Sequence, residues 1–351
     1  MNYRIASIPG DGIGVDVTIE ARKVLDTAAA KYGFSLSWQE FDWSCERYAK
    51  SGSMMPDDGV EQLSEFDGIL LGAVGFPGVP DHVSLWGLLI PLRRAFQQYV
   101  NLRPVRLLPG TTSALAGRTA DELEMVIVRE NSEGEYSAIG GRHNAGRPDE
   151  FVLQESVFTR VGVERIIRYA FELARSRSGH VTSATKSNGL IHSMPYWDEI
   201  FAEVAARYPD VPAQQCHVDA LAARMVQAPD RIDVVVASNL FGDVLSDLAA
   251  AVTGGLGMAP SGNINPSGEL PSMFEAVHGS APDIAGQGIA NPVAQILAAA
   301  MLLEHLGETV AAQAIRTSVD EVLTAGSART PDLGGTATTT ALGTVVAETL
   351  R

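Results

Sequence analysis

Short apolar segments bounded by turn residues alternate along this chain with stretches of helical periodicity. The segments that predict strands are residues 3–8, 68–74, 125–128, 180–184 and 234–237. Between them, the apolar residues of 163–174 recur every three or four positions, as in an amphipathic helix. Another helix is expected to start at Asn291, which can cap it, with Pro292 in its first turn. Strands that alternate with helices predict an α/β fold around a largely parallel sheet with both faces covered.

The first strand-to-helix turn carries Gly10, Gly12 and Gly14, which invites comparison with the dinucleotide-binding fingerprint GxGxxG. That fingerprint would require glycine at position 15, where the chain has Val15. The fold is therefore not expected to be a Rossmann fold, and we interpret the glycines as a structural turn. If the chain uses NAD, another surface must hold it.

Composition narrows the function classes. With 351 residues, 46% of them hydrophobic, the chain can bury a large core in two domains or one elaborate domain. A formal net charge of -16 argues against nucleic acid as a partner. No apolar run is long enough for a membrane span or a cleavable leader, so a cytoplasmic location is expected. The two cysteines, Cys45 and Cys216, have no metal or disulfide spacing and are expected to be buried thiols.

Two carboxylates follow the apolar run of residues 234–238. Asp243 and Asp247 are four positions apart and share one face if the segment is helical. They would then lie beyond the carboxyl end of a buried strand, where α/β enzymes place their sites. Such a pair suits a hard cation such as Mg²⁺ or Mn²⁺, and Asp219, after another β-like run, is a candidate third ligand. The alternative is a solvated helix face.

Three arginines stand beside apolar or turn segments rather than in charged runs: Arg93, Arg103 and Arg129. Each could be a surface charge, but an arginine pairs two-point with a carboxylate, so three that converge would suit a dicarboxylate or tricarboxylate. Tyr136 and Lys186 add a possible acid and a possible base. The residues alone thus predict an anion-binding metal site with acid–base groups.

Eight ordered segments together resemble the β-decarboxylating dehydrogenases, the family of isocitrate, isopropylmalate, and tartrate or D-malate dehydrogenases. The segments are IPGDGIG, LLGAVG, NLRP, VRENSEGEY, SATKSN, SNLFGDVLSD, GGLGMAPS and HGSAPDIAGQGIANP, which span nearly the whole chain. The resemblance implies the isocitrate/isopropylmalate dehydrogenase fold, with two domains around a twisted sheet. It assigns residues 1–99 and 255–351 to a large cofactor-binding domain and residues 100–254 to a small domain with the dimer interface.

The resemblance also implies roles for the residues above. It assigns Arg93, Arg103 and Arg129 to the substrate carboxylates, Tyr136 to the acid and Lys186 to the base. The implied metal ligands are Asp219, Asp243 and Asp247. The implied cofactor residues are Asn188, His278, Gly279, Asp283 and Asn291, and a carboxylate at Asp283 would favour NAD over NADP. The family forms homodimers in which each site takes Lys186 and Asp219 from the partner subunit.

The segment before Arg93 indicates the branch of the family. The tricarboxylate branch has a serine and an asparagine where this chain has Gly87 and Leu89, and the isopropylmalate branch has a glutamate where it has Trp86. The run DHVSLWG instead resembles tartrate and D-malate dehydrogenases. Trp86 and Leu89 are therefore expected to line the substrate pocket, with the bulk of Trp86 excluding an isopropyl group. Pro91 departs from the family pattern and is expected to bend the helix.

The expected function is NAD-dependent oxidation of a small 2-hydroxy dicarboxylate with Mn²⁺ or Mg²⁺, usually with decarboxylation. The sequence leaves a requirement for K⁺ open. The main alternative is 3-isopropylmalate dehydrogenase. A non-catalytic subunit of the same fold is the alternative from another class, and it is disfavoured because every matched acid, base and metal ligand is present.

Overall fold

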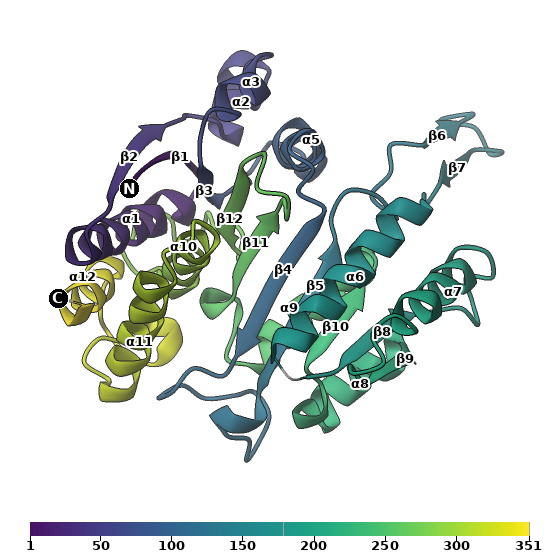
Figure 1. Ribbon diagram of the computed structural model, residues 1–351. Helices are drawn as coiled ribbons and strands as arrows, with labels where there is room; N and C mark the ends of the chain where they lie inside the picture. Colours follow the sequence, from purple (N-terminus) through teal and green to yellow (C-terminus); the bar gives the residue numbers. More distant parts are fainter. Residues whose placement is uncertain (178, 351) are drawn as a thin grey trace.

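A single sheet organises the computed structural model, which describes residues 1–177 and 179–350 (Figure 1). In spatial order its strands are β2 (Ser35–Glu40), β1 (Asn2–Gly10), β3 (Gly68–Ala73), β12 (Ser272–Ala276), β11 (Pro260–Ile264), β4 (Val100–Arg106), β5 (Glu124–Glu130), β10 (Val234–Ala237), β8 (Val181–Thr185) and β9 (Ala213–His217). Strand β11 runs antiparallel to β12 and β4, and β4 runs antiparallel to β5. The other neighbours are parallel, so the predicted α/β fold with a largely parallel sheet is confirmed.

Helices follow most of the strands, as the alternation in the sequence predicts. They are α1 (Ile13–Tyr32), α2 (Cys45–Ser51), α3 (Gly59–Leu63), α4 (Asp81–Ser84), α5 (Ile90–Ala95), α6 (Arg160–Arg177), α7 (Ser193–Ala205), α8 (Val218–Gln227), α9 (Asn239–Val252), α10 (Val293–His305), α11 (Thr309–Ala325) and α12 (Thr339–Leu350). A π-helical turn, Leu85–Leu89, joins α4 to α5. The predicted helix exists, but it starts one residue later than expected, with Pro292 as its N-cap, and Asn291 Oδ1 accepts a hydrogen bond from Val293 N at 3.0 Å.

Side chains that alternate along the strands belong to two layers of hydrophobic core, one on each face of the sheet. On β10, Val234 and Val236 join a cluster with residues of α1, α6, α7 and α10, whereas Val235 and Ala237 face α8 and α9. Successive side chains of a strand point to opposite faces, which explains this division. Ile69 and Leu71 of β3 pack on that second face with residues of α2, α3 and α5. Helices α5 and α9 therefore cover the same face of the sheet from its two halves.

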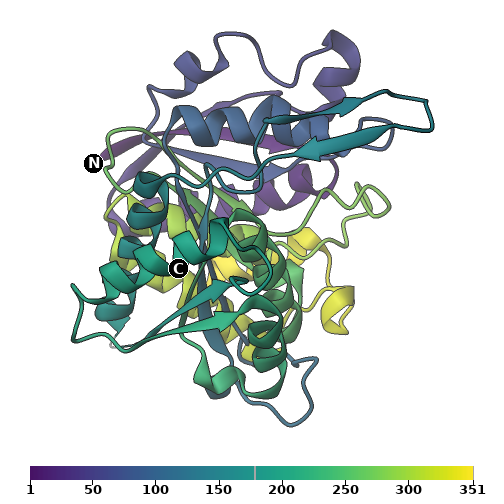
Figure 2. The same cartoon turned by 90° about the vertical axis from the view of Figure 1, so that its right-hand side faces the viewer.

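The place of a strand in the sheet reflects its position in the chain. Strands from both ends of the chain occupy one half, beside α1 and α10–α12, and strands from the middle of the chain occupy the other (Figure 1). A separate hairpin of β6 (Gly140–His143) and β7 (Phe151–Gln154) projects away from this body (Figure 2). Every residue of the two hairpin strands is exposed.

The glycine turn after β1 is a packing device, as interpreted from the sequence. Gly10 and Gly12 have φ of 73° and 57°, in the left-handed region that favours glycine. A Cβ on Gly12 would lie 2.1 Å from the carbonyl oxygen of Ser280. The N–H of Ile13 donates to that same oxygen at 2.8 Å, which holds the turn against the segment that follows His278.

Two further expectations concern the burial of the cysteines and the possibility of a membrane-spanning helix. Cys45 and Cys216 are both free and buried, as predicted. None of the helices within residues 1–177 and 179–350 is long and apolar enough to cross a membrane.

Candidate active site

The three arginines converge on one cavity of about 220 Å³ on the face covered by α5 and α9. Arg93 comes from α5, Arg103 from β4 and Arg129 from β5, and all three side chains are buried. Arg103 and Arg129 lie on adjacent strands at positions that point to the same face of the sheet. The three arginines are separated in the sequence, and the fold brings them together, as expected.

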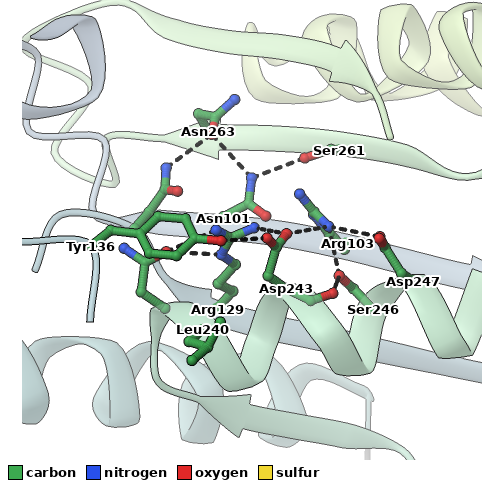
Figure 3. Close-up of polar contacts among 12 residues, drawn as sticks. Asn101, Arg103, Arg129, Tyr136, Leu240, Asp243, Ser246, Asp247, Ser261 and Asn263 are labelled. Atoms are coloured by element: carbon green, nitrogen blue, oxygen red, sulfur yellow. Dashed lines mark hydrogen bonds and ion pairs between the residues drawn. The ribbon is translucent and has the colours of Figure 1, made fainter. Parts of the chain in front are cut away.

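Each of the three arginines has a carboxylate partner, and Arg103 and Arg129 share Asp243. Arg129 donates from Nε and Nη2 to Asn239 Oδ1, at 3.1 and 2.8 Å, and from Nη1 to Asp243 (Figure 3). Arg103 Nη1 donates to Ser246 Oγ at 2.6 Å. The buried Nε atoms of Arg93 and Arg103 have no hydrogen-bond partner among the residues that the structure describes. Because a buried guanidinium donor is normally paired, these free donors suit a bound carboxylate.

The charge balance of the site favours an anion. Burial, and then the neighbouring Arg129, lower the pKa of Arg103 to about 10. Burial also lowers the pKa of Arg93, while Glu275 opposes that shift through an ion pair of 3.2 Å. Groups that repel one another in this way gain from any negative charge placed between them. Clustered arginines thus give an acidic protein a locally positive site, which the sequence argument required.

Tyr136 lies beside the first aspartate of α9. Its hydroxyl donates to Asp243 Oδ2 at 2.7 Å, and the guanidinium of Arg129 lies over its ring at 5.3 Å (Figure 3). Burial, and then the hydrogen bond to Asp243, raise the pKa of Tyr136. The phenol therefore keeps its proton near neutral pH and can act as an acid.

Asp243 and Asp247 occupy successive turns of α9, after β10, as predicted. Both contact Arg103 Nη1, at 3.3 and 3.4 Å, so their carboxylates face the same space (Figure 3). Burial raises the pKa of Asp243, but Arg129 and Arg103 outweigh it and hold that pKa below the usual value. Burial raises the pKa of Asp247, against the opposing effect of Arg103. Carboxylate oxygens in this arrangement fit a hard divalent cation.

The third predicted ligand lies elsewhere in this chain. Asp219, in the first turn of α8, accepts a hydrogen bond from Lys186 Nζ at 2.8 Å. Neither residue lines the cavity with the arginines. Within the described part of this chain, no three histidine, cysteine, aspartate or glutamate side chains are grouped closely enough to hold a metal ion. Asp243 lines this cavity, Asp247 lies one turn further along α9 in contact with Arg103, and Lys186 with Asp219 forms a separate pair.

The predicted cofactor residues lie in three kinds of place. His278 and Gly279 line the cavity, and His278 Nδ1 donates to the Gly279 carbonyl at 2.9 Å. Burial lowers the pKa of His278, which favours a neutral ring. Asn188 and Asp283 are exposed outside it. Asn291 is buried, where it binds Val293 N and donates from Nδ2 to Asp332 at 2.9 Å.

Sequence reasoning missed Glu275, which lines the cavity from β12. Its Oε1 accepts from Arg93 Nη2 at 3.2 Å and from Asn263 Nδ2 at 2.7 Å. Asn263 Oδ1 in turn accepts from the amides of Asn101 and Asn131 (Figure 3). The available signal was a single carboxylate within the buried strand Ser272–Ala276, because a charged residue is rarely buried without a partner.

The structure corrects the expectation that Trp86 lines the substrate pocket. Leu85 and Leu89 line the cavity, and Trp86 does not. The Trp86 ring instead lies against the guanidinium of Arg94, 5.4 Å from its centroid. Pro91 lies in the first turn of α5, directly after the π-helical turn, so the helix departs from regular α-helical geometry at the position where the sequence predicted a bend. The bulk of Trp86 therefore does not reduce the volume of this cavity.

A larger cavity of about 460 Å³ lies on the other face of β4, between α6 and α10. Leu102 and Pro104 line it, on either side of Arg103, which faces the arginine site. Its arginines are paired with carboxylates, as in the ion pair of Arg106 with Asp320 at 2.7 Å. The smaller cavity is the candidate active site because it has the unpaired cationic donors.

Known proteins similar to this chain are enzymes of the family that the sequence motifs resemble. The family model described as isocitrate/isopropylmalate dehydrogenase matches residues 4–346. The chain is 57% identical over 344 residues to D-malate dehydrogenase [decarboxylating] of Escherichia coli (strain K12), covering 96% of this chain and 95% of that protein. It is 52% identical over 358 residues to tartrate dehydrogenase/decarboxylase of Pseudomonas putida, covering 99% and 98%.

A solved structure gives the same result for the fold. Isocitrate dehydrogenase from Methylococcus capsulatus superposes with a TM-score of 0.89 at 37% sequence identity, with 99% of each chain covered. The protein belongs to the isocitrate/isopropylmalate dehydrogenase family. It is an enzyme of the branch that DHVSLWG indicated, because the two relatives named above are D-malate and tartrate enzymes. Dehydrogenases of this family use NAD and a divalent metal ion.

Proposed function

We propose that this chain oxidises a small 2-hydroxy dicarboxylate, D-malate or tartrate, with NAD and Mn²⁺ or Mg²⁺, and decarboxylates the resulting 2-keto acid where a β-carboxylate is present. The observation that carries this proposal is the cavity of about 220 Å³ lined by three buried arginines. The names of the relatives support the same substrates.

The arginines have the charge and geometry to hold the two carboxylates of such a substrate. Leu85 and Leu89 form an apolar wall that offers no donor to a third carboxylate. An unpaired charge in a partly dry cavity costs several kcal/mol, so isocitrate is expected to be a poor substrate. Isopropylmalate is the second candidate, and one observation favours it: with Trp86 outside the cavity, the wall is aliphatic.

Tyr136 is placed to act as the acid. Its raised pKa keeps the phenolic proton available at neutral pH, and its hydrogen bond to Asp243 fixes the hydroxyl at the edge of the arginine cluster. A bound divalent cation supplies Lewis-acid stabilisation of the negative charge that develops on the substrate oxygen. Asp243 and Asp247 are the residues of this chain that we propose as its ligands.

We propose that the active enzyme is a homodimer in which the partner subunit supplies Lys186, as the base, and Asp219, as the third ligand. The separation of these two residues from the cavity of their own chain supports this arrangement. Exposed apolar side chains on the same helices support it too: Val244 of α9 is 60% exposed and Val226 of α8 is 43% exposed. The projecting hairpin also exposes Phe151 and Val152.

For the cofactor, we propose that His278, Gly279, Asp283 and Asn291 would hold NAD, and that the carboxylate of Asp283 would accept hydrogen bonds from its ribose hydroxyls. Support comes from the position of His278 and Gly279 in the cavity wall. The division of the sheet into halves supports a large domain of residues 1–99 and 255–351 and a small domain of residues 100–254. We propose a cytoplasmic location for an enzyme acting on free NAD and dicarboxylates, and a K⁺ requirement is left to assay.

A panel assay tests the function. D-malate, the tartrates, 3-isopropylmalate and isocitrate are supplied at equal concentrations with NAD and Mn²⁺, and NADH and CO₂ are both measured. We expect kcat/KM to be highest for D-malate or a tartrate and lowest for isocitrate. A tenfold preference for 3-isopropylmalate would move the assignment to the second candidate, and turnover of isocitrate alone would overturn both.

A further inference from the structure

A buried carboxylate lies in the glycine turn after β1, outside the arginine cavity. Asp11 is 4% exposed, and within the described part of the chain its partners are backbone N–H groups rather than a lysine or an arginine. Its Oδ2 accepts hydrogen bonds from the N–H groups of Cys45 and Gly75, at 2.9 and 3.1 Å, and its Oδ1 accepts one from Glu46 at 3.2 Å. A buried carboxylate without a cation depends on such donors, so these contacts fix its position.

The three donors belong to two segments that the turn must meet. Two of them are the first N–H groups of α2, which have no partner inside that helix. The third, Gly75, follows residues 72–74, which form part of the cavity wall. The N–H of Asp11 itself donates to the carbonyl of Ala73 at 2.7 Å. Asp11 therefore joins the turn to α2 and to the wall of the active site.

The same residue defines the place of Ser280, in the segment of residues 278–283. A Cβ on Gly12 would lie 2.1 Å from the Ser280 carbonyl oxygen, and a Cβ on Gly75 would lie 3.1 Å from its Oγ. Ser280 thus fits between two glycines. Gly12 follows Asp11 in the chain, and Gly75 is bonded to the Asp11 carboxylate, so Asp11 sets the spacing between them.

The segment of residues 278–283 needs this support because its backbone is strained. Ala281 has a φ of 38°, in the left-handed region that an alanine rarely adopts. Such a conformation persists only when the surrounding structure imposes it. Ala281 packs against a cluster of Ile13, Val17 and Ala290, so the turn and α1 supply contacts that impose it.

This strained segment carries two of the residues proposed to hold NAD. The buried Nε2 of His278 has no hydrogen-bond partner among the described residues, and the carboxylate of Asp283 is exposed. An unpaired ring nitrogen and a nearby carboxylate suit a ligand that carries several polar groups.

We propose that Asp11 is a positioning residue for the cofactor, which acts through Ser280 to hold residues 278–283 in the conformation that binds NAD. Asp11 itself contacts neither NAD nor the dicarboxylate. This inference rests on the proposed function, because it assumes that His278 and Asp283 hold NAD.

The test measures the Kd of NAD by calorimetry on the substrate-free protein, and KM for NAD and D-malate by steady-state kinetics with Mn²⁺. Asp11→Ala leaves three N–H groups without an acceptor, so the Kd and KM of NAD should rise by about tenfold or more. The KM for D-malate should change by less than about threefold, because the arginines keep their contacts. Asp11→Asn keeps one acceptor oxygen, so it should shift NAD binding less in the same direction, and it replaces Asp11→Ala if that variant does not fold.

Glu20→Gln is the matched control for the loss of a buried carboxylate. Glu20 is 2% exposed in α1, where it pairs with Lys23 and lies against Gly343 of α12. This variant should lower the melting temperature and leave the Kd of NAD unchanged. If Asp11→Ala also lowers only the melting temperature, or weakens NAD and D-malate equally, the positioning role of Asp11 is overturned.

A second arm tests the strain at Ala281. Glycine adopts the left-handed region without strain, so in an Ala281→Gly background Asp11→Ala should weaken NAD binding by only about threefold. An effect of the same size in both backgrounds would overturn the inference. Wild-type protein that binds no NAD in the calorimeter would instead overturn the proposed cofactor site, which is a distinct result from NAD binding that does not respond to Asp11.

Discussion

The hydroxyl of Tyr136 donates a hydrogen bond to Asp243 Oδ2 at 2.7 Å, and this contact joins the proposed acid to a proposed metal ligand. The two residues come from segments that follow neighbouring strands, Tyr136 from the segment after β5 and Asp243 from α9, after β10. Glu135 strengthens the connection, because its carboxylate accepts from the N–H of Leu240 at the start of α9. The acid and the metal site are therefore held by one set of contacts.

Removal of the phenolic hydroxyl should slow proton transfer without removing the arginine site. We expect Tyr136→Phe to lower kcat by about 10²- to 10⁴-fold, the usual contribution of a general acid, with little change in substrate binding. Stopped-flow measurement of NADH formation and of product release separates the steps. Asp149→Asn, on an exposed loop, is the matched control. Unchanged kcat in Tyr136→Phe would assign the acid to another group.

Divalent metal ion should be required for turnover, because Asp243 and Asp247 otherwise face each other with only arginines between them. Exhaustive EDTA treatment should abolish activity, and Mn²⁺ or Mg²⁺ should restore it. Asp247→Asn should weaken Mn²⁺ binding, measured by calorimetry on the substrate-free protein, by at least about tenfold. Full activity in metal-free buffer would rule out this part of the mechanism.

The shared site predicts complementation between inactive variants. Lys186→Ala and Arg129→Ala subunits are each expected to be inactive alone, since each removes one group from every site. In a mixed dimer, one of the two sites would keep all its groups, so activity should return towards a quarter of the wild-type value in an equal mixture. Subunit exchange is verified by native mass spectrometry. If mixed dimers form and remain inactive, Lys186 does not come from the partner.

NAD should be preferred over NADP because a carboxylate at Asp283 accepts hydrogen bonds from ribose hydroxyls and repels a 2′-phosphate. We expect Asp283→Ala to lower kcat/KM for NAD and to reduce the preference by at least about tenfold. Asp149→Ala, at an exposed position outside the site, serves as a control for the loss of a surface carboxylate. Equal use of both cofactors by the wild type would contradict the proposed orientation.

Glu130 should make the free energy of unfolding decrease as pH rises, because its pKa is higher in the folded state than in the unfolded state. Burial raises its pKa from 4.5 to about 6, although Ser132 and Glu133 donate hydrogen bonds to the carboxylate. The folded state then binds more protons than the unfolded state between these two pH values, so this group's contribution to the free energy of unfolding falls as pH rises from 4.5 to 6. The full decrease in this contribution to the free energy of unfolding is about 2 kcal/mol.

The measurement is the free energy of unfolding by urea at pH 4.5, 5.5 and 7 for wild type and Glu130→Gln. The difference between wild type and variant should decrease with pH across that window and stay constant above it. Glu65→Gln, at an exposed site, is the control and should track the wild type. A difference that grows with pH would show that the hydrogen bonds outweigh burial at Glu130.

Much of the site could be predicted from the sequence because its residues occupy special places in local patterns. Asp243 and Asp247 follow the buried strand β10, and a strand end beside a helix start is recognisable from apolar runs and spacing. Arg129 ends an apolar strand, which the same reasoning detects. Glu275 escaped notice because its role depends on two contacts, with Arg93 and Asn263, that join distant parts of the chain.

The sequence by itself determined the α/β class, the absence of a Rossmann fingerprint, the helix of the aspartates and the family, because these depend on periodicity and ordered motifs. Only the tertiary structure decided which side chains meet. It placed Leu85 in the cavity and Trp86 outside it, because a single π-turn ahead of Pro91 rotates the helix, and no count of positions from Arg93 reveals that. It also paired Lys186 with Asp219 away from the arginines, because strand order in the sheet, and not order in the chain, fixes distance.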